Sequence, residues 1–188
     1  DNDGSLNGYG GQGSLYLEVK SRKARWQQTN QPGFAQQKRV YQDNENPFIT
    51  GTARYAQTEK KKDKAFVEWV PDIPETGEYA VYVSYQTLPN SVSDAKYLVF
   101  HNGGVTEFKV NQQIGGGTWV YLGTFAFDKG KNDYGMVVLS NESKEKGVVC
   151  ADAVRFGGGM GNIARGGETS GLPRYLEGSR YFAQWAGM

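Results

Sequence analysis

The sequence predicts an all-β protein, an antiparallel β-sandwich of the jelly-roll type with about eight strands and a short C-terminal helix. Short segments of alternating apolar and polar residues recur along the chain between turn residues, and no helical periodicity separates them. Glycine is abundant, with 26 of 188 residues, as in loop-rich β proteins. Aromatic residues reach 13% against 22% charged residues, so the strands carry many large rings. The length suits one sizeable domain.

The first third of the chain contains one clear strand. Residues 1–13 are polar and rich in glycine, which indicates a loop. Segment 14–20 alternates and predicts a strand that places three apolar side chains on one face: Leu15, Leu17 and Val19. From 21 to 58 the pattern is irregular, with one short strand indicated at 38–41. Irregular stretches of this length inside a domain are often functional loops.

The strand signal sharpens from residue 65 onward. Seven further strands are predicted between turn residues: 65–70, 77–86, 95–101, 105–111, 114–130, 134–141 and 147–156. The cleanest alternation is in 77–86, where four large side chains share a face: Tyr79, Val81, Val83 and Tyr85. Residues 101–104 predict a hairpin turn, because Asn-Gly and Gly-Gly accept positive φ. Gly123 inside its strand indicates a β-bulge.

The C-terminal residues differ from the sandwich, which we expect to span residues 1–158. Residues 159–172 are rich in glycine and predict a linker. Pro173 suits the first turn of a helix over 173–188, whose aromatic side chains gather on one side. A helix this short is marginal alone, so its apolar side needs a partner surface. We expect it to begin, or connect to, a further domain.

Charge, hydropathy and cysteine content exclude several classes of protein. The net charge of +1 provides no field that would attract nucleic acid or an acidic membrane. No segment approaches the roughly 20 apolar residues of a membrane span. Cys150 is the single cysteine, so no intramolecular disulfide can form. The chain starts and stops abruptly, at Asp1 and Met188, and we expect it to be part of a longer secreted protein whose signal peptide has been removed.

No catalytic or cofactor-binding constellation stands out, so neither catalytic residues nor a cofactor are predicted. His101, the only histidine, lies beside the hairpin turn without identifiable partners for a triad or a metal site. Cys150 alternates with valines and fits a small buried residue. Residues 1–4 begin like a calcium loop, but Gln12 stands where the EF-hand pattern needs glutamate. Calcium bound by scattered carbonyl oxygens stays open, because such sites leave no sequence pattern.

Four residues are candidates for ligand contact: Tyr82, Trp119, Tyr121 and Asp152. Trp119 and Tyr121 alternate with Val120 and Leu122, so this strand can turn an aromatic face outward. An exposed aromatic ring stacks on the apolar face of a sugar, although burial in a core is the commoner fate of such rings. Asp152 lies among apolar residues, and a buried carboxylate needs hydrogen bonds. It either ties loop amides to the strand end or contacts a ligand.

Several segments together resemble a known family. They are VFHNGGVTEFKVNQ, GGGTWVYLGTFAF, VVLSN and ADAVRFG, which occur in order between residues 64 and 158. In this combination the chain resembles the golvesin C-terminal-like, or xanthan-lyase-like, carbohydrate-binding β-sandwich domain of bacterial (Bacteroidetes-type) secreted proteins. The resemblance implies a secreted, periplasmic or cell-surface protein with a glycan or peptidoglycan as ligand. It also implies an adjacent domain of the same polypeptide as partner.

We therefore expect a noncatalytic carbohydrate- or cell-wall-binding accessory module of a secreted enzyme, such as a polysaccharide lyase or an amidase-like hydrolase acting on peptidoglycan. Two alternatives remain. A structural spacer or interaction domain would carry an apolar patch where its neighbour docks. A catalytic unit of a lyase or hydrolase would bring paired acids, or His101 with an arginine or tyrosine, into one deep cleft. The preference for the first rests on analogy between folds.

Overall fold

A computed structural model gives the fold of residues 1–2, 14–35, 46–60 and 64–157. These residues form eleven strands and no helix. The strands, in chain order, are β1 (Leu15–Val19), β2 (Gln27–Gly33), β3 (Gly51–Gln57), β4 (Phe66–Val70), β5 (Gly77–Ser84), β6 (Ala95–His101), β7 (Gly104–Val110), β8 (Val120–Phe127), β9 (Met136–Ser140), β10 (Val148–Ala151) and β11 (Ala153–Phe156). The linker predicted at 159–172, the helix predicted at 173–188 and the short strand predicted at 38–41 lie outside the described residues.

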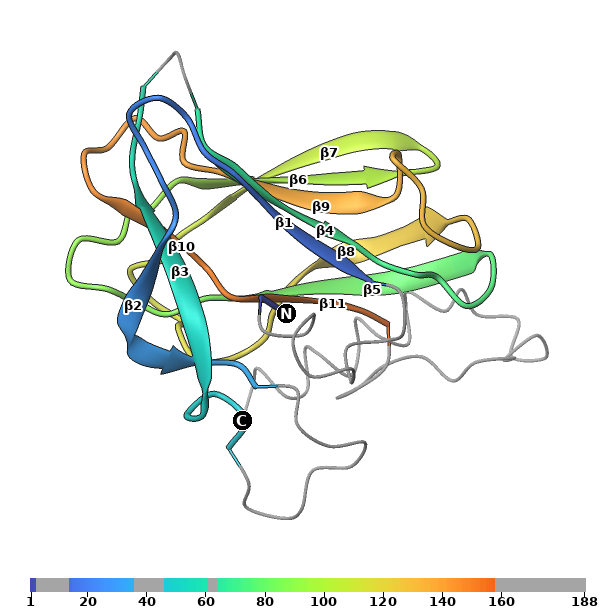
Figure 1. Cartoon of the computed structure of the whole chain (residues 1–188). Helices are drawn as coiled ribbons and strands as arrows, with labels where there is room; N and C mark the ends of the chain where they lie inside the picture. The colour runs from blue at the N-terminus through green and yellow to red at the C-terminus, as the bar shows by residue number, and fades with distance from the viewer. Residues whose placement is uncertain (3–13, 36–45, 61–63, 158–188) are drawn as a thin grey trace.

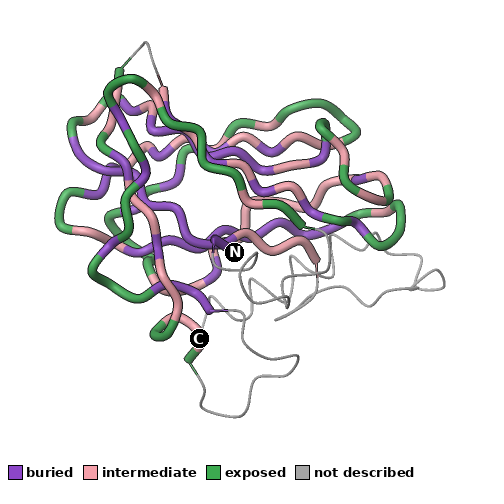
Figure 2. The backbone as a smooth tube through the Cα atoms, viewed as in Figure 1, coloured by how far each residue is buried: buried purple, intermediate pink, exposed green. Residues whose placement is uncertain are grey.

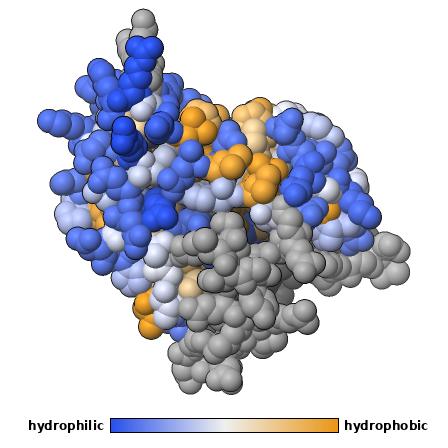
Figure 3. Space-filling model, in the orientation of Figure 1, coloured by the Kyte–Doolittle hydropathy of each residue, from blue (hydrophilic) through white to orange (hydrophobic). Residues whose placement is uncertain are grey.

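One layer of the fold is a five-stranded antiparallel sheet in the order β1-β4-β9-β6-β7. Side chains alternate between its two faces along each strand. The inner face contributes large side chains to the core, among them Trp69, Tyr97 and Leu139. β1 and β7 form its edges, and Figure 3 shows apolar side chains on the molecular surface around β1. This layer therefore carries apolar side chains on both of its faces.

The other layer consists of two three-stranded antiparallel sheets, β11-β5-β8 and β10-β3-β2. In Figure 1, β5, β8 and β11 lie across from the five-stranded sheet, and β2, β3 and β10 lie to one side. β10 and β11 are consecutive, with Asp152 alone between them. One extended segment therefore passes from one small sheet into the other, and Asp152 marks the junction.

The main core lies between the layers, where Figure 2 shows buried backbone on both sides. The alternation predicted for 77–86 is confirmed, because the four residues predicted to share a face all belong to this core: Tyr79, Val81, Val83 and Tyr85. The predicted all-β antiparallel sandwich is thus confirmed. In the described part of the chain, no helix has the length and apolar character to cross a membrane.

A buried amide fastens the second layer to the first. Gln112 is fully buried just after β7. Its side-chain nitrogen donates to the carbonyl oxygen of Cys150 (2.8 Å) and to the Tyr97 hydroxyl (3.1 Å). Its side-chain oxygen accepts a hydrogen bond from the Cys150 amide (2.8 Å). Gln112 therefore pairs with β10 through its side chain, as the backbone of a neighbouring strand would.

Two local predictions from glycine are also confirmed. In the β6–β7 hairpin, His101 lies opposite Gly104, and Gly104 has φ of 118°, which favours glycine. Gly123 lies at a register shift between β5 and β8, which is the predicted bulge. A Cβ atom at Gly123 would come within 2.8 Å of the Phe125 ring, so a side chain there would displace that ring.

The structure contains three more strands than the sequence predicted. β2 reads QQTNQPG, and its proline and polar residues are tolerated because it is an edge strand. β3 buries only the small side chains of Ala53 and Ala56, so its apolar signal is weak. The predicted strand 147–156 is two strands, since the chain changes sheets at Asp152. These differences all concern pairing partners distant in sequence.

Candidate functional site

A row of polar and aromatic side chains crosses the outer face of the β11-β5-β8 sheet. Val81 and Val83 point into the core, so Tyr82 between them points to the opposite side of the sheet. Tyr82 lies opposite Arg155 of β11 and opposite Tyr121 of β8. The centroids of the Tyr82 and Tyr121 rings are 5.2 Å apart. Three neighbouring strands thus place one guanidinium and two phenol rings side by side.

Trp119, which immediately precedes β8, extends this row into a cluster of rings. Its ring centroid lies 4.9 Å from that of Phe34 and 5.8 Å from that of Phe48. The Arg155 guanidinium carbon lies 5.4 Å from the centroid of the Trp119 ring, a cation–π distance. We call the resulting set the aromatic face; its members are Phe34, Phe48, Tyr82, Trp119, Tyr121 and Arg155.

The members of the aromatic face differ in exposure. Tyr82 and Trp119 are only 4% and 8% exposed, whereas Tyr121 is half-buried. The Tyr121 hydroxyl lies 2.8 Å from the Thr124 hydroxyl. Burial raises the pKa of Tyr82, the neighbouring Tyr121 adds to this rise, and Arg155 opposes it. The Tyr82 phenol therefore stays protonated and neutral at physiological pH.

Asp152 lies beneath this face and holds part of it in place. Its side chain is fully buried. The Phe34 amide donates to both carboxylate oxygens (3.0 and 2.9 Å), and the Ser84 hydroxyl donates to one of them (3.1 Å). A Cβ atom at Gly33 would lie 2.8 Å from that carboxylate and 2.3 Å from the Thr52 carbonyl oxygen, so only glycine fits. Asp152 therefore fixes the backbone of Phe34, whose ring packs on Trp119.

The structure brings all four predicted site residues into one region. Tyr82, Trp119 and Tyr121 share the aromatic face, and Asp152 supports it from below. A direct contact of any of them with a ligand stays a prediction. Sequence reasoning missed Phe34, Phe48 and Arg155. The alternation of β11 could have indicated Arg155, since it is two residues from Ala153 on the same face.

The histidine and the cysteine occupy structural positions. His101 Nδ1 accepts a hydrogen bond from the Gly103 amide (3.1 Å), and Nε2 lies 2.9 Å from the Thr106 hydroxyl. Cys150 is fully buried, and burial raises the pKa of its thiol to about 12. Among the described residues, no group of three or more His, Cys, Asp or Glu side chains could hold a metal ion.

Comparison with known proteins defines the family. The Golvesin C-terminal domain family matches residues 21–158. The chain belongs to this family. Xanthan lyase from Bacillus sp. (strain GL1) is 33% identical over 114 residues, which are 57% of this chain and 12% of the lyase. The Golvesin C-terminal domain thus matches a small part of that relative.

A solved structure shares the fold of this Golvesin C-terminal domain. A Paenibacillus xanthan lyase superimposes with a TM-score of 0.53 and 24% identity, over 78% of this chain and 13% of the lyase. An isomalto-dextranase from Arthrobacter globiformis T6 gives a TM-score of 0.41 and 17% identity, over 77% of this chain and 23% of that enzyme. The first comparison supports the sandwich architecture independently of the sequence match.

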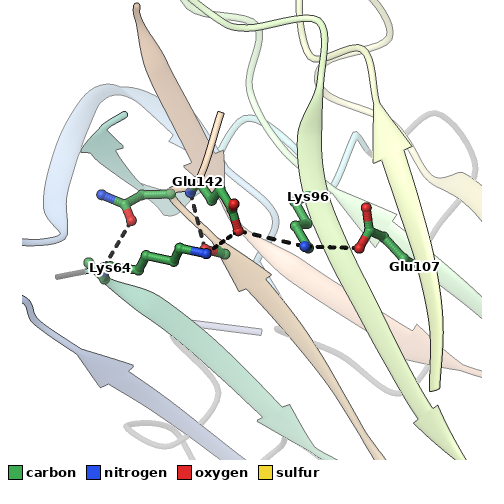
Figure 4. A network of polar contacts seen from close by, with 7 residues as sticks. Lys64, Lys96, Glu107 and Glu142 are labelled. Atoms are coloured by element: carbon green, nitrogen blue, oxygen red, sulfur yellow. Dashed lines mark hydrogen bonds and ion pairs between the residues drawn. The ribbon is translucent and has the colours of Figure 1, made fainter. Parts of the chain in front are cut away.

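A chain of alternating charges crosses the other layer of this Golvesin C-terminal domain (Figure 4). Lys64 pairs with Glu142, Glu142 lies 3.6 Å from Lys96, and Lys96 lies 2.9 Å from Glu107. The hydrogen bond from Lys64 and the charge of Lys96 lower the pKa of Glu142. All four side chains are at least one quarter exposed, so each pair contributes at most about 1 kcal/mol. This network has both charge signs and forms no anionic or cationic ligand site.

Proposed function

We propose that this domain is a noncatalytic accessory module that binds a glycan or peptidoglycan within a secreted polypeptide acting on polysaccharide or cell wall. The observation that carries the proposal is the aromatic face. Aromatic rings with a neighbouring guanidinium can stack on sugar rings and donate hydrogen bonds to their hydroxyls. Tyr121 presents the half-exposed ring, and Tyr82 and Trp119 pack behind it.

The comparisons support an accessory role. The relative named as a xanthan lyase is matched over 12% of its length, and its solved counterpart over 13%. A region that small is a domain among several in a protein that acts on a polysaccharide. We extend that setting to this chain, which we place outside the cytoplasm, in the periplasm or at the cell surface. Cell fractionation with an antibody against this domain tests the location, and a purely cytoplasmic signal would contradict it.

The positions of His101 and Cys150 support a noncatalytic role. Both ring nitrogens of His101 lie within hydrogen-bonding distance of other groups of the same hairpin. A thiol with a pKa of about 12 is not a nucleophile at neutral pH, because the thiolate is the reactive form. Because His101 Nδ1 accepts a hydrogen bond from the Gly103 amide, the neutral ring carries its proton on Nε2 and donates to the Thr106 hydroxyl, so it does not act as a base toward that hydroxyl.

The direct test is binding of the purified domain to xanthan, a neutral glucan and peptidoglycan, measured by affinity electrophoresis and sedimentation. We expect binding to at least one of them. Tyr121→Ala should weaken that binding by roughly 2- to 12-fold, the equivalent of one aromatic stacking contact of about 0.5–1.5 kcal/mol. Tyr134→Ala is the matched control, because Tyr134 is 53% exposed and lies outside the aromatic face.

Two results would overturn the proposal. One is the absence of binding to all three ligands by a folded domain. The other is wild-type affinity of Tyr121→Ala together with an intact circular dichroism spectrum, which would place any binding site elsewhere. In the first case a structural or interaction role remains, and a separate observation favours that role: the apolar outer surface of the five-stranded sheet.

A further inference from the structure

The outer surface of the five-stranded sheet is mostly apolar, with a few charged residues among the apolar ones. The strand registers place apolar side chains on this side in all five strands. None of them belongs to the main core or packs against it. We call this set the apolar sheet face; its members are Leu15, Leu17, Val19, Phe66, Val70, Leu98, Phe100, Val105, Met136 and Val138.

Several members of the apolar sheet face are open to solvent. Leu15 and Leu17, on the edge strand β1, are each 46% exposed. Val105, on the opposite edge strand β7, is 54% exposed. Figure 3 shows the apolar surface over β1. An antiparallel sheet with one solvated face normally alternates apolar with polar residues. Here apolar residues outnumber polar ones on the outer face too, and exposed apolar surface of this kind marks an interaction site.

The chemistry of this face indicates a protein partner. Its exposed members are aliphatic, and its two aromatic residues, Phe66 and Phe100, carry no polar group. A glycan would need hydrogen-bonding partners for its hydroxyls, and the apolar members offer none. Charged residues also lie on this side: Lys96 and Glu107 form an ion pair, and Glu68 lies between Leu17 and Val138. Apolar side chains interspersed with a few charged ones are typical of a contact between protein domains.

The size of the face distinguishes between partners. Five strands about 4.8 Å apart, each with about five residues rising 3.4 Å, cover roughly 400 Å². A stable complex of free partners buries about 800 Å² on each, whereas contacts between domains of one chain bury about 600–1,500 Å² in total. A covalent tether supplies an effective concentration in the millimolar range, so a contact of this size suffices. The area therefore fits a tethered neighbour better than a second copy.

We propose that the apolar sheet face is the docking surface for a neighbouring domain of the same polypeptide. The extent of the match to xanthan lyase supports this occupant, since the matched region is 12% of that relative and the rest of it is further polypeptide. The proposal is independent of glycan binding, because the aromatic face lies on the other layer of the sandwich. An experiment can therefore contradict the docking proposal without contradicting glycan binding, and the reverse.

The test compares the 188-residue chain with the complete product of its gene by hydroxyl-radical footprinting. Docking should lower the oxidation rates of Leu15, Leu17 and Val105 several-fold in the complete product. Leu17→Lys should restore those rates, because it places a charge in the contact. Ile114→Lys is the matched control, since Ile114 is 66% exposed and lies outside the apolar sheet face, and it should leave the protection unchanged.

Three outcomes would overturn the proposal. One is a complete gene product no longer than this chain. Another is equal oxidation of the apolar sheet face in the two proteins. The third is self-association of the 188-residue chain that Leu17→Lys abolishes, measured by analytical ultracentrifugation, which would assign the face to a second copy. Protection that Leu17→Lys removes and Ile114→Lys keeps supports the neighbouring domain.

Discussion

Replacing Asp152 with alanine is expected to lower the free energy of unfolding by about 3 kcal/mol. The carboxylate accepts hydrogen bonds from the Phe34 amide and the Ser84 hydroxyl in a fully buried position. A buried donor that loses its acceptor costs about 1–3 kcal/mol, so two donors cost about 2–6 kcal/mol. The lower half of that range applies, because a hydroxyl can rotate toward another acceptor and a backbone amide cannot.

Thermal unfolding followed by far-UV circular dichroism measures this loss. For a domain of this size 1 kcal/mol corresponds to about 2–4 °C in Tm, so Asp152→Ala should lower Tm by about 6–12 °C. Near-UV circular dichroism should change as well, because Asp152 fixes Phe34 and the Phe34 ring packs 4.9 Å from Trp119. Ser84→Ala is the matched control, since it removes one neutral donor and should cost about 1 kcal/mol.

The reasoning would be refuted by an Asp152→Ala variant within 1 kcal/mol of wild type. It would also be refuted by a Ser84→Ala variant as unstable as Asp152→Ala, because the hydrogen bonds from the Phe34 amide would then contribute nothing to the free energy of unfolding. A further check is Asp152→Asn, which keeps one oxygen for the Phe34 amide and should lie between wild type and Asp152→Ala. If Asp152→Asn and Asp152→Ala are equally unstable, the negative charge rather than the acceptor oxygen is essential.

Three other perturbations test the core and the titrating groups. Gln112→Ala should cost about 2–3 kcal/mol in urea unfolding, because the Cys150 amide loses its buried acceptor; a loss below about 1 kcal/mol would contradict this. The Cys150 thiol, with its pKa raised to about 12, should react with a thiol reagent only as fast as the protein unfolds; rapid labelling of the native protein would show that it is accessible. Burial lowers the pKa of His101, so the folded state binds fewer protons than the unfolded state below its usual value of about 6.5. Stability should therefore be complete above that pH and fall as the pH decreases toward the lowered pKa, and His101→Gln should reduce this dependence below about pH 6.5; an unchanged slope in His101→Gln would assign it to other groups.

The strands that the sequence predicts best are those in which large apolar side chains alternate with outward-facing residues. β5 alternates Tyr79, Val81 and Val83 with outward residues, and all three lie in the core as predicted. β2 and β3 were not predicted because their inward positions hold small or polar residues; β3 pairs with β10, which is distant in sequence, and β2 pairs with β3. Local pattern identifies a strand, but it does not identify the partner that an edge or junction strand will find.

In the candidate site, too, some properties follow from the local sequence pattern and others depend on tertiary contacts. The face shared by Trp119 and Tyr121 follows from alternation with Val120 and Leu122, which pack against the main core. The burial of Trp119 does not follow, because it depends on Phe34, which reaches it from a distant part of the chain. The register of three strands, which places Arg155 opposite Tyr82, is likewise a tertiary property. Sequence alone could therefore indicate that Trp119 and Tyr121 share a face, but not how exposed they are.

The two candidate surfaces belong to different layers of the sandwich, and this separation has a functional consequence. The aromatic face lies on the outside of β11-β5-β8, and the apolar sheet face lies on the outside of β1-β4-β9-β6-β7. The main core lies between Tyr121 and Leu17, so effects of substitutions at the two sites should add. A domain arranged in this way can dock on a neighbour through one layer while the other layer stays open to a ligand. In the complete polypeptide, Leu17→Lys should then release the domain from its neighbour without changing the affinity of the isolated domain for glycan, and Tyr121→Ala should do the reverse.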